Sequence, residues 1–183
     1  MIDTSKLVSK PGGSSFAPSG AVTDRILLEI ASQYETAVSR KMTAIKPEEL
    51  PRRFPGVEPL LETTKYDGEG VFVYCEDGKE PLAFNAYSGR VRIGLPALVD
   101  LQQQLNKQGT RKGLFRAELY LPDFKDGKRA GIADVIRASF SGTEVDLSHL
   151  RLAMLDVIML DGKDLLLTGG AERENRTQLF SWD

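Results

Sequence analysis

The chain has 183 residues, of which 41% are hydrophobic, so it has the size of one domain and can bury a core. Its net charge of −2 excludes a whole-molecule attraction to nucleic acid, so such a contact would need a local basic patch. The single cysteine, Cys75, excludes an internal disulfide, and a reducing cytoplasm is the expected location. No apolar run approaches the length of a membrane span, so no membrane partner is expected.

The first part of the chain predicts an arm followed by a helix. Residues 8–20 are rich in glycine, serine and proline, which predicts a flexible arm over residues 1–20. A helix is predicted from Thr23, which can cap it. Its apolar face is predicted to hold Ile26, Leu27, Ile30, Tyr34, Ala37 and Val38. Four prolines between residues 46 and 60 then exclude a continuous helix.

Beyond residue 68 the pattern changes to short β-rich runs. Asp77-Gly78 and Ser88-Gly89 separate these runs and predict antiparallel hairpins. There follow a predicted helix over 96–107, a strand over 113–122, a short helix over 131–139, a strand over 150–162 and a helical pattern over 172–183. Helices that interrupt such strands indicate an α+β fold, with antiparallel sheets flanked by helices.

Lys65, Asp67 and Gly68 stand directly before the first of these strands. Asp-Gly is common in turns for backbone reasons, so the structural interpretation is a charged residue ahead of a tight turn. The chemical interpretation is a nucleophile, because an unprotonated lysine amine can attack phosphorus. Asp67 could then help to hold a divalent metal, and the glycine leaves room for a phosphate near the backbone.

The segment "KYDG" (65–68), followed by hairpin strands, resembles the first motif of the covalent nucleotidyltransferases. These are the ATP-dependent DNA ligases, the RNA ligases and the mRNA-capping guanylyltransferases. Later segments resemble further ligase motifs in the same order. The whole resemblance runs from about residue 55 to the end of the chain. These segments are "FNAYSGRVRIGLPAL" (84–98), "LFRAELYL" (114–121), "LAMLDVIMLDGKDL" (152–165) and "ENRTQL" (174–179).

The resemblance implies a ligase-type adenylation fold over residues 21–183, with ATP and Mg²⁺ as cofactors. Lys65 would attack the α-phosphate of ATP and carry AMP, Asp67 would help to bind the metal, and Glu118 would contact the ribose or the metal. The nucleotide-binding residues that it implies are Asp67, Gly68, Arg90, Glu118 and Leu155. A complete enzyme would pass the AMP to the 5′-phosphate of nicked DNA or RNA, with DNA favoured by the segment at 152–165.

Several positions depart from the family pattern. The arginine expected five residues after the lysine is Gly70, and the arginine of the second motif aligns with Tyr87 unless Arg90 or Arg92 replaces it. An Asp-Gly expected before Glu118 is Arg116-Ala117, and the aromatic residue that stacks on adenine is Leu155. The late lysine-rich and glutamate motifs and the OB-fold domain are not found, so the predicted fold is incomplete.

Three interpretations stay open. The chain is part of an ATP-dependent ligase, or a non-catalytic relative that binds nucleotide, nucleic acid or protein, or an unrelated α+β domain with a coincidental motif. Two loops are basic, one over 106–113 and one over 123–131. The first contains Lys107, Arg111 and Lys112. They are candidates for contact with a phosphate backbone, although cations at a helix C-terminus are also common for dipole reasons.

Overall fold

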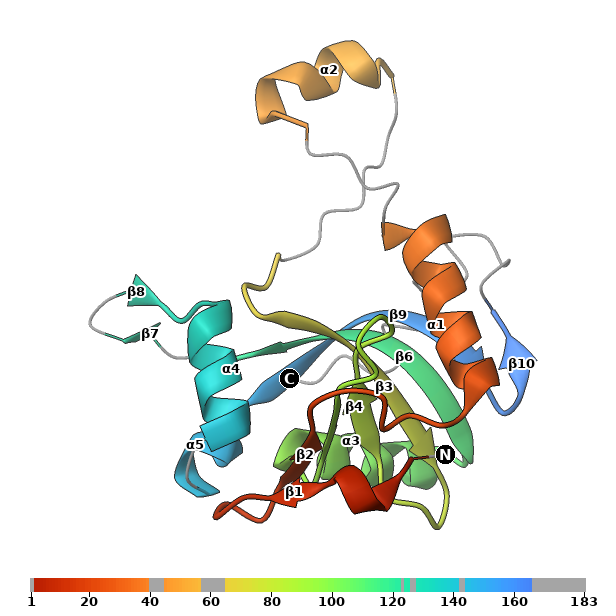
Figure 1. Cartoon of the computed structure of the whole chain (residues 1–183). Coiled ribbons are helices and arrows are strands. Elements are labelled where there is room, and N and C mark those ends of the chain that lie inside the picture. Colours follow the sequence, from red (N-terminus) through yellow and green to blue (C-terminus); the bar gives the residue numbers. More distant parts are fainter. Residues whose placement is uncertain are drawn as a thin grey trace.

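The computed structural model describes residues 2–39, 45–56, 65–122, 124–125, 128–141 and 144–165. Eight strands of this part form one antiparallel sheet in the order β1-β2-β5-β4-β3-β6-β9-β10 (Figure 1). Their bounds are β1 Val8–Ser9, β2 Ser15–Ala17, β3 Glu69–Glu76, β4 Leu82–Phe84, β5 Val91–Ile93, β6 Lys112–Tyr120, β9 Arg151–Leu160 and β10 Lys163–Asp164. The short strands β7 (Phe124–Lys125) and β8 (Lys128–Arg129) pair only with each other.

Helices occupy the connections between strands. They are η1 Thr4–Lys6, α1 Arg25–Ala37, η3 Pro47–Glu49, α2 Leu50–Arg53, α3 Pro96–Lys107, α4 Ile132–Ser141 and α5 Glu144–His149. The α+β class is therefore confirmed, as are the helices predicted at 96–107 and 131–139. The expectation of several antiparallel sheets needs correction, since the long strands join one sheet and only the small β7–β8 pair stands apart. The pattern at 172–183 lies outside the described residues.

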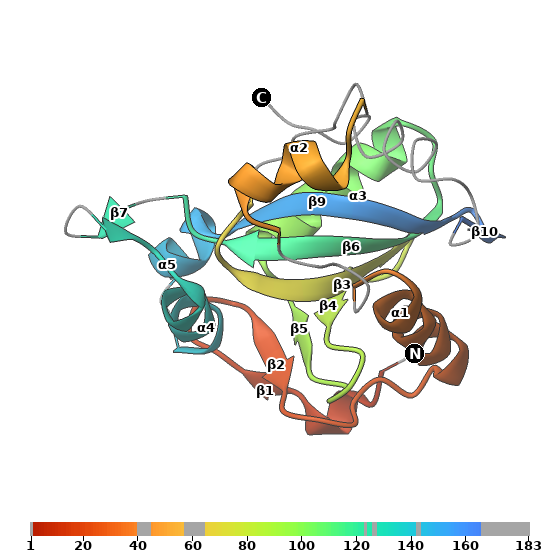
Figure 2. The same ribbon diagram turned by 90° about the horizontal axis from the view of Figure 1, so that it is seen from above.

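Both faces of the central strands are buried. On one face, which we call the α3–α4 face, Val71, Val73, Phe115 and Val157 pack with residues of α3, α4 and α5. On the other, the α1 face, Phe72, Tyr74, Leu114 and Ile158 pack with Leu27, Ala31 and Tyr34 of α1. Figure 2 shows β3, β6 and β9 side by side at the centre of the fold. Burial on both faces explains why these strands read as nearly continuous apolar runs.

The N-terminal residues form an edge of the sheet, where an arm was expected. Residues 15–17 pair with β5, and Ala17 and Ala21 are fully buried. The first bridge, Ile2 to Val22, lies within the same layer. Glycine-rich composition misled the sequence prediction because Gly13, with a φ of 84°, serves the turn between two very short strands.

Helix α1 forms where predicted, but its start and its buried face differ in detail. Asp24 caps it, since its carboxylate accepts a hydrogen bond from the Leu27 N–H at 3.1 Å, and Thr23 does not act as the cap. Ile26 is 72% exposed, because the buried stripe runs through Leu27, Ala31 and Tyr34 at a spacing of four and three residues. None of the helices in the described part of the chain has the length and apolar character needed to cross a bilayer.

Two substitutions test the position of the N-terminal strands. Ala17→Asp puts a carboxylate into the core and is expected to cost about 3 kcal/mol or more of folding free energy. Val8→Asp changes a residue that is 48% exposed and should have almost no effect on denaturant unfolding. If both variants unfold like the wild type, residues 2–20 lie outside the folded domain.

Candidate functional site

The pairing of β3 with β6 brings the lysine motif to Glu118. Gly70 lies opposite Glu118 in this ladder, so residues 65–68 enter the sheet beside that carboxylate. The Gly68 N–H donates a hydrogen bond to Glu118 Oε1 at 3.1 Å. Lys65 and Asp67 are exposed and close enough for their charges to act on Glu118. The structure thus gathers four of the six residues suggested by the sequence: Lys65, Asp67, Gly68 and Glu118.

The glycine of the motif is required by a close backbone approach. A Cβ atom at Gly68 would lie 2.2 Å from the carbonyl oxygen of Leu119 and 2.9 Å from its carbon. Any side chain here would push β3 and β6 apart, since real Cβ atoms do not approach a backbone that closely. Gly68 is therefore set by steric contact with β6, which also places its N–H against Glu118.

Glu118 lies in an environment that disfavours its charge. Burial is the largest influence and raises the pKa of its carboxyl above the ordinary 4.5, and the negative charge of Asp67 adds to this. Arg116, the Gly68 N–H and Lys65 act in the opposite direction and lower the pKa. A bound cation can stabilise the charged form of a carboxylate that is disfavoured by burial in this way.

Arg116 is a member of the site that the sequence analysis treated only as a departure from the motif. A Cβ atom at Gly70 would lie 2.3 Å from Arg116 Nη2 and 2.7 Å from Nη1. The guanidinium thus lies over Gly70, the position at which the ligase-type motif would have an arginine. The Arg116 Nη1 atom donates hydrogen bonds to the Val71 and Ala117 carbonyl oxygens, at 3.0 and 3.2 Å, which fix its position. A cationic group from the neighbouring strand therefore occupies the space beside residue 70.

Helix α1 is tied to this face of the sheet by two consecutive residues. Glu35 Oε1 lies 3.4 Å from Arg116 Nε, and both side chains are mostly buried. Next to it, the Tyr34 hydroxyl donates to Asp156 Oδ2 at 3.1 Å. Asp156 lies opposite Arg116 in the ladder between β6 and β9. Glu35 consequently neutralises part of the positive charge that Arg116 brings to the site.

Leu155 is placed by an irregularity in β9. Met154 pairs with Ala117 and Asp156 pairs with Arg116, so Leu155 is the extra residue of a β-bulge. Met154 packs toward the α3–α4 face, and alternation sends Leu155 to the α1 face with Asp156. Its side chain is 46% exposed. Leu155 therefore shares a face with Glu118, although it has no ring to stack on a base.

Arg90 is not brought to Glu118. Arg92, two residues along β5, pairs with Ala83 and lies on the α3–α4 face, and Arg90 shares that face by alternation. The Arg90 guanidinium lies 5.6 Å from the ring centre of Phe140 in α4. Arg92, rather than Arg90, reaches the lysine motif, because it forms an ion pair with Glu69 beside Gly68.

Asp67 and Glu118 were proposed as metal ligands. The described residues contain no group of three or more His, Cys, Asp or Glu side chains placed to hold a metal. Mg²⁺ commonly binds through one or two carboxylates together with substrate phosphates and water. The two oxygen-bearing side chains, together with the raised pKa of Glu118, fit that mode of binding.

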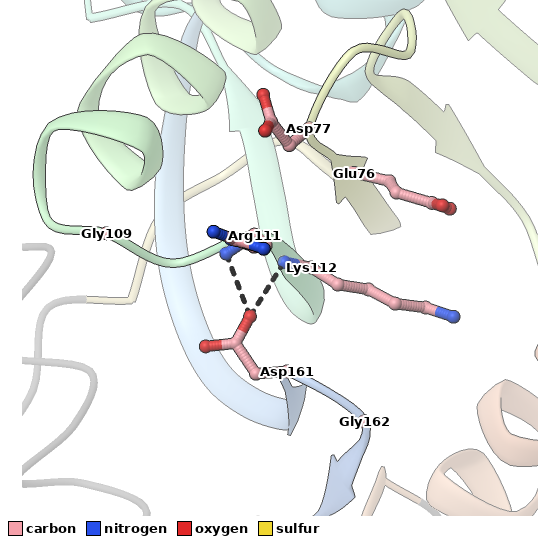
Figure 3. Close-up of a pocket in the computed structure, with 7 residues that line it drawn as sticks. All are labelled: Glu76, Asp77, Gly109, Arg111, Lys112, Asp161 and Gly162. Carbon is pink, nitrogen blue, oxygen red and sulfur yellow. Dashed lines mark hydrogen bonds between the residues drawn. The ribbon is translucent and has the colours of Figure 1, made fainter.

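A hollow lies at the opposite end of β3 and β6 from Gly68 and Glu118 (Figure 3). Its lining residues are Glu76, Asp77, Gly109, Arg111, Lys112, Asp161 and Gly162. Asp161 accepts hydrogen bonds from the Arg111 and Lys112 N–H groups at 2.8 and 2.9 Å, while Glu76 pairs with Lys79. The two hydrogen bonds of Asp161 hold the turn between β9 and β10 against the start of β6. The basic loop at 106–113 therefore lies far along the strands from Glu118.

Comparison with known proteins adds no family assignment: no family model matches the chain, and no curated protein matches it.

A double-mutant cycle tests the position of Arg116. Gly70→Ala should destabilise the wild type, because its Cβ displaces the guanidinium from its two carbonyl acceptors. In an Arg116→Ala background the same change should cost about 1 kcal/mol less, as measured by urea unfolding. Equal costs in both backgrounds would show that the guanidinium lies elsewhere.

The raised pKa of Glu118 predicts a pH-dependent gain from Glu118→Gln. Below pH 4.5 the carboxyl is protonated in both folded and unfolded chains, so the variant and the wild type should melt alike. As the pH rises toward 8, the buried charge destabilises only the wild type, and the variant should melt at the higher temperature. Glu76→Gln is the control of opposite sign, because Lys79 and Tyr74 lower the Glu76 pKa. The assignment is contradicted if the melting temperature of Glu118→Gln, relative to that of the wild type, is lower at pH 8 than at pH 4.

Proposed function

We propose that this chain forms the nucleotide-charging site of an ATP-dependent polynucleotide ligase, which transfers AMP through Lys65. The hydrogen bond between the Gly68 N–H and Glu118 carries the proposal, because it joins the lysine motif to the acidic residue of a second ligase-like segment. The two segments are 50 residues apart in sequence. A coincidental Lys-x-Asp-Gly would have no reason to lie beside that particular glutamate.

The proposed reaction is a displacement at phosphorus. The unprotonated Nζ of Lys65 attacks the α-phosphate of ATP, a nitrogen–phosphorus bond forms, and the bond to pyrophosphate breaks. After the attack the positively charged nitrogen releases one proton to solvent. Mg²⁺, held by Asp67 and Glu118, would neutralise phosphate charge. Gly68 leaves the strand backbone open to a phosphate, and Glu118 is placed to hold the metal or a ribose hydroxyl.

Arg116 supports the proposal because it replaces the arginine that the motif lacks at residue 70. Its guanidinium lies over Gly70 on the α1 face, the face that also carries Glu118 and Leu155. A guanidinium there can bind a phosphate oxygen or stabilise the developing charge on the leaving group. Departures in two neighbouring strands thus compensate each other in space.

Two observations favour a second function, a non-catalytic module that binds nucleotide through the same face. Glu35 pairs with Arg116 and so reduces the positive charge available for phosphates. Leu155 offers apolar contact without aromatic stacking. Such a module would bind ATP without forming a covalent bond to Lys65.

Labelling with ATP distinguishes the two functions. After incubation with α-labelled ATP and Mg²⁺ and denaturing electrophoresis, the wild type should carry label. Lys65→Ala should abolish it, and Arg116→Ala should slow it about tenfold or more. Lys163→Ala, which changes an exposed lysine in β10, is the matched control. Label that survives loss of Lys65, or binding without label, rules out the enzymatic proposal.

A further inference from the structure

Five residues outside the proposed charging site form a second assembly, which we call the cation–aromatic cluster. Its members are Lys10, Phe16, Arg90, Arg92 and Phe140. They come from the N-terminal segment, β2, β5 and α4, on the α3–α4 face of the sheet. Figure 2 shows α4 alongside the edge formed by β1 and β2. None of these elements belongs to the strand pair that carries Gly68 and Glu118.

The two rings hold the three cations together. Phe16 and Phe140 meet edge to face, with ring centres 4.9 Å apart. Lys10 Nζ lies 4.7 Å from the Phe16 ring centre, and the Arg92 and Arg90 guanidinium carbons lie 4.2 and 5.6 Å from that of Phe140. All lie within the range of cation–π attraction. The rings thus keep like charges close, in positions that are already ordered before any ligand binds.

The cluster has more positive charge than its surroundings neutralise. Among the described residues, Glu69 is the only carboxylate within 4.0 Å of these cations, and it pairs with Arg92. Arg92 is 3% exposed, and its Nε atom has no hydrogen-bond partner. Burial lowers the Arg92 pKa, Glu69 raises it, and the positive charge of Arg90 lowers it further. Lys10 and Arg90 are partly exposed and therefore remain available to an anion.

We propose that the cation–aromatic cluster binds the phosphate backbone of a polynucleotide, with Lys10 and Arg90 as the contacting cations. This inference rests on the proposed function, for which it names the surface that receives the nucleic acid. Ordered guanidinium and ammonium groups beside aromatic rings are the features that proteins use to hold a nucleic-acid strand.

The cluster is joined to the strand that carries the charging site by one ion pair. Arg92 contacts Glu69, and the next residue toward the N-terminus is Gly68, whose N–H binds Glu118. Glu69 therefore connects the cluster, on the α3–α4 face, to the start of β3, which carries the proposed charging site on the α1 face. The other basic loop, with Lys107 and Arg111, lies at the far end of β3 and β6.

Fluorescence anisotropy with a labelled single-stranded or nicked DNA oligonucleotide, without ATP or Mg²⁺, tests the inference. Lys10→Gln/Arg90→Gln should weaken binding at least about tenfold at about 50 mM salt. It should also reduce the slope of log K against log salt by about 1.4–1.8, as expected for two lost phosphate contacts. The matched control, Lys107→Gln/Arg111→Gln, removes the same charge at the far end and should change affinity less than about twofold.

Equal weakening by both double variants, or no measurable binding by the wild type, would overturn the inference. Displacement of the oligonucleotide by a phosphoserine peptide at equal phosphate concentration would assign the cluster to phosphopeptides instead. Circular dichroism of both variants checks that each is folded. Because the assay forms no lysyl-AMP, a chain that cannot be labelled by ATP but shows this pattern would refute the charging reaction alone.

Discussion

The pairing of β3 with β6 is the constraint on which the candidate site depends. Its eight residue pairs, from Glu69–Leu119 to Glu76–Lys112, set Gly70 opposite Glu118. A slip by one residue would turn Glu118 to the α3–α4 face and separate it from Gly68. The ladder is buried on both faces, so such a slip would also expose core side chains. Packing of the whole domain thereby fixes the position of the lysine motif.

The same strand start serves two chemically different faces. Gly68 and Gly70 have no side chains, which lets Glu118 approach the backbone on the α1 face and lets the Arg116 guanidinium lie over residue 70. Glu69, between them, points to the opposite face and pairs with Arg92. One three-residue stretch therefore links the proposed charging site to the cation–aromatic cluster.

Local signals were sufficient to predict much of the fold. Pro96 fixes the start of α3, and the Asp161-Gly162 pair, with φ angles of 47° and 81°, closes the turn after β9 as its sequence indicates. The N-terminal strands were missed because two- and three-residue strands carry no periodicity, and their pairing with β5 is a non-local contact. The extra helix α5 was missed because it is only six residues long.

For the site, sequence reasoning placed Lys65, Asp67, Gly68 and Glu118 in one motif set, and the register brings these four together. Arg116 was counted as a departure, because its proximity to Gly70 arises across the ladder and not along the chain. Arg90 was assigned to the nucleotide although strand alternation sends it to the other face. The one signal for Arg116 in the sequence is that an arginine stands in the motif of one strand while the arginine expected in the motif of the adjacent strand is Gly70.

The central claim, that nucleotide binds over the start of β3, is tested most directly by NMR of the ¹⁵N-labelled chain titrated with ATP and Mg²⁺. Glycine amide signals report the two ends of the strand pair separately. The account predicts that the Gly68 and Gly70 signals shift, because the Gly68 N–H binds Glu118 at the site, while those of Gly109 and Gly162 at the far hollow stay unchanged. Shifts confined to Gly109 and Gly162, or no shifts at saturating nucleotide, would contradict it.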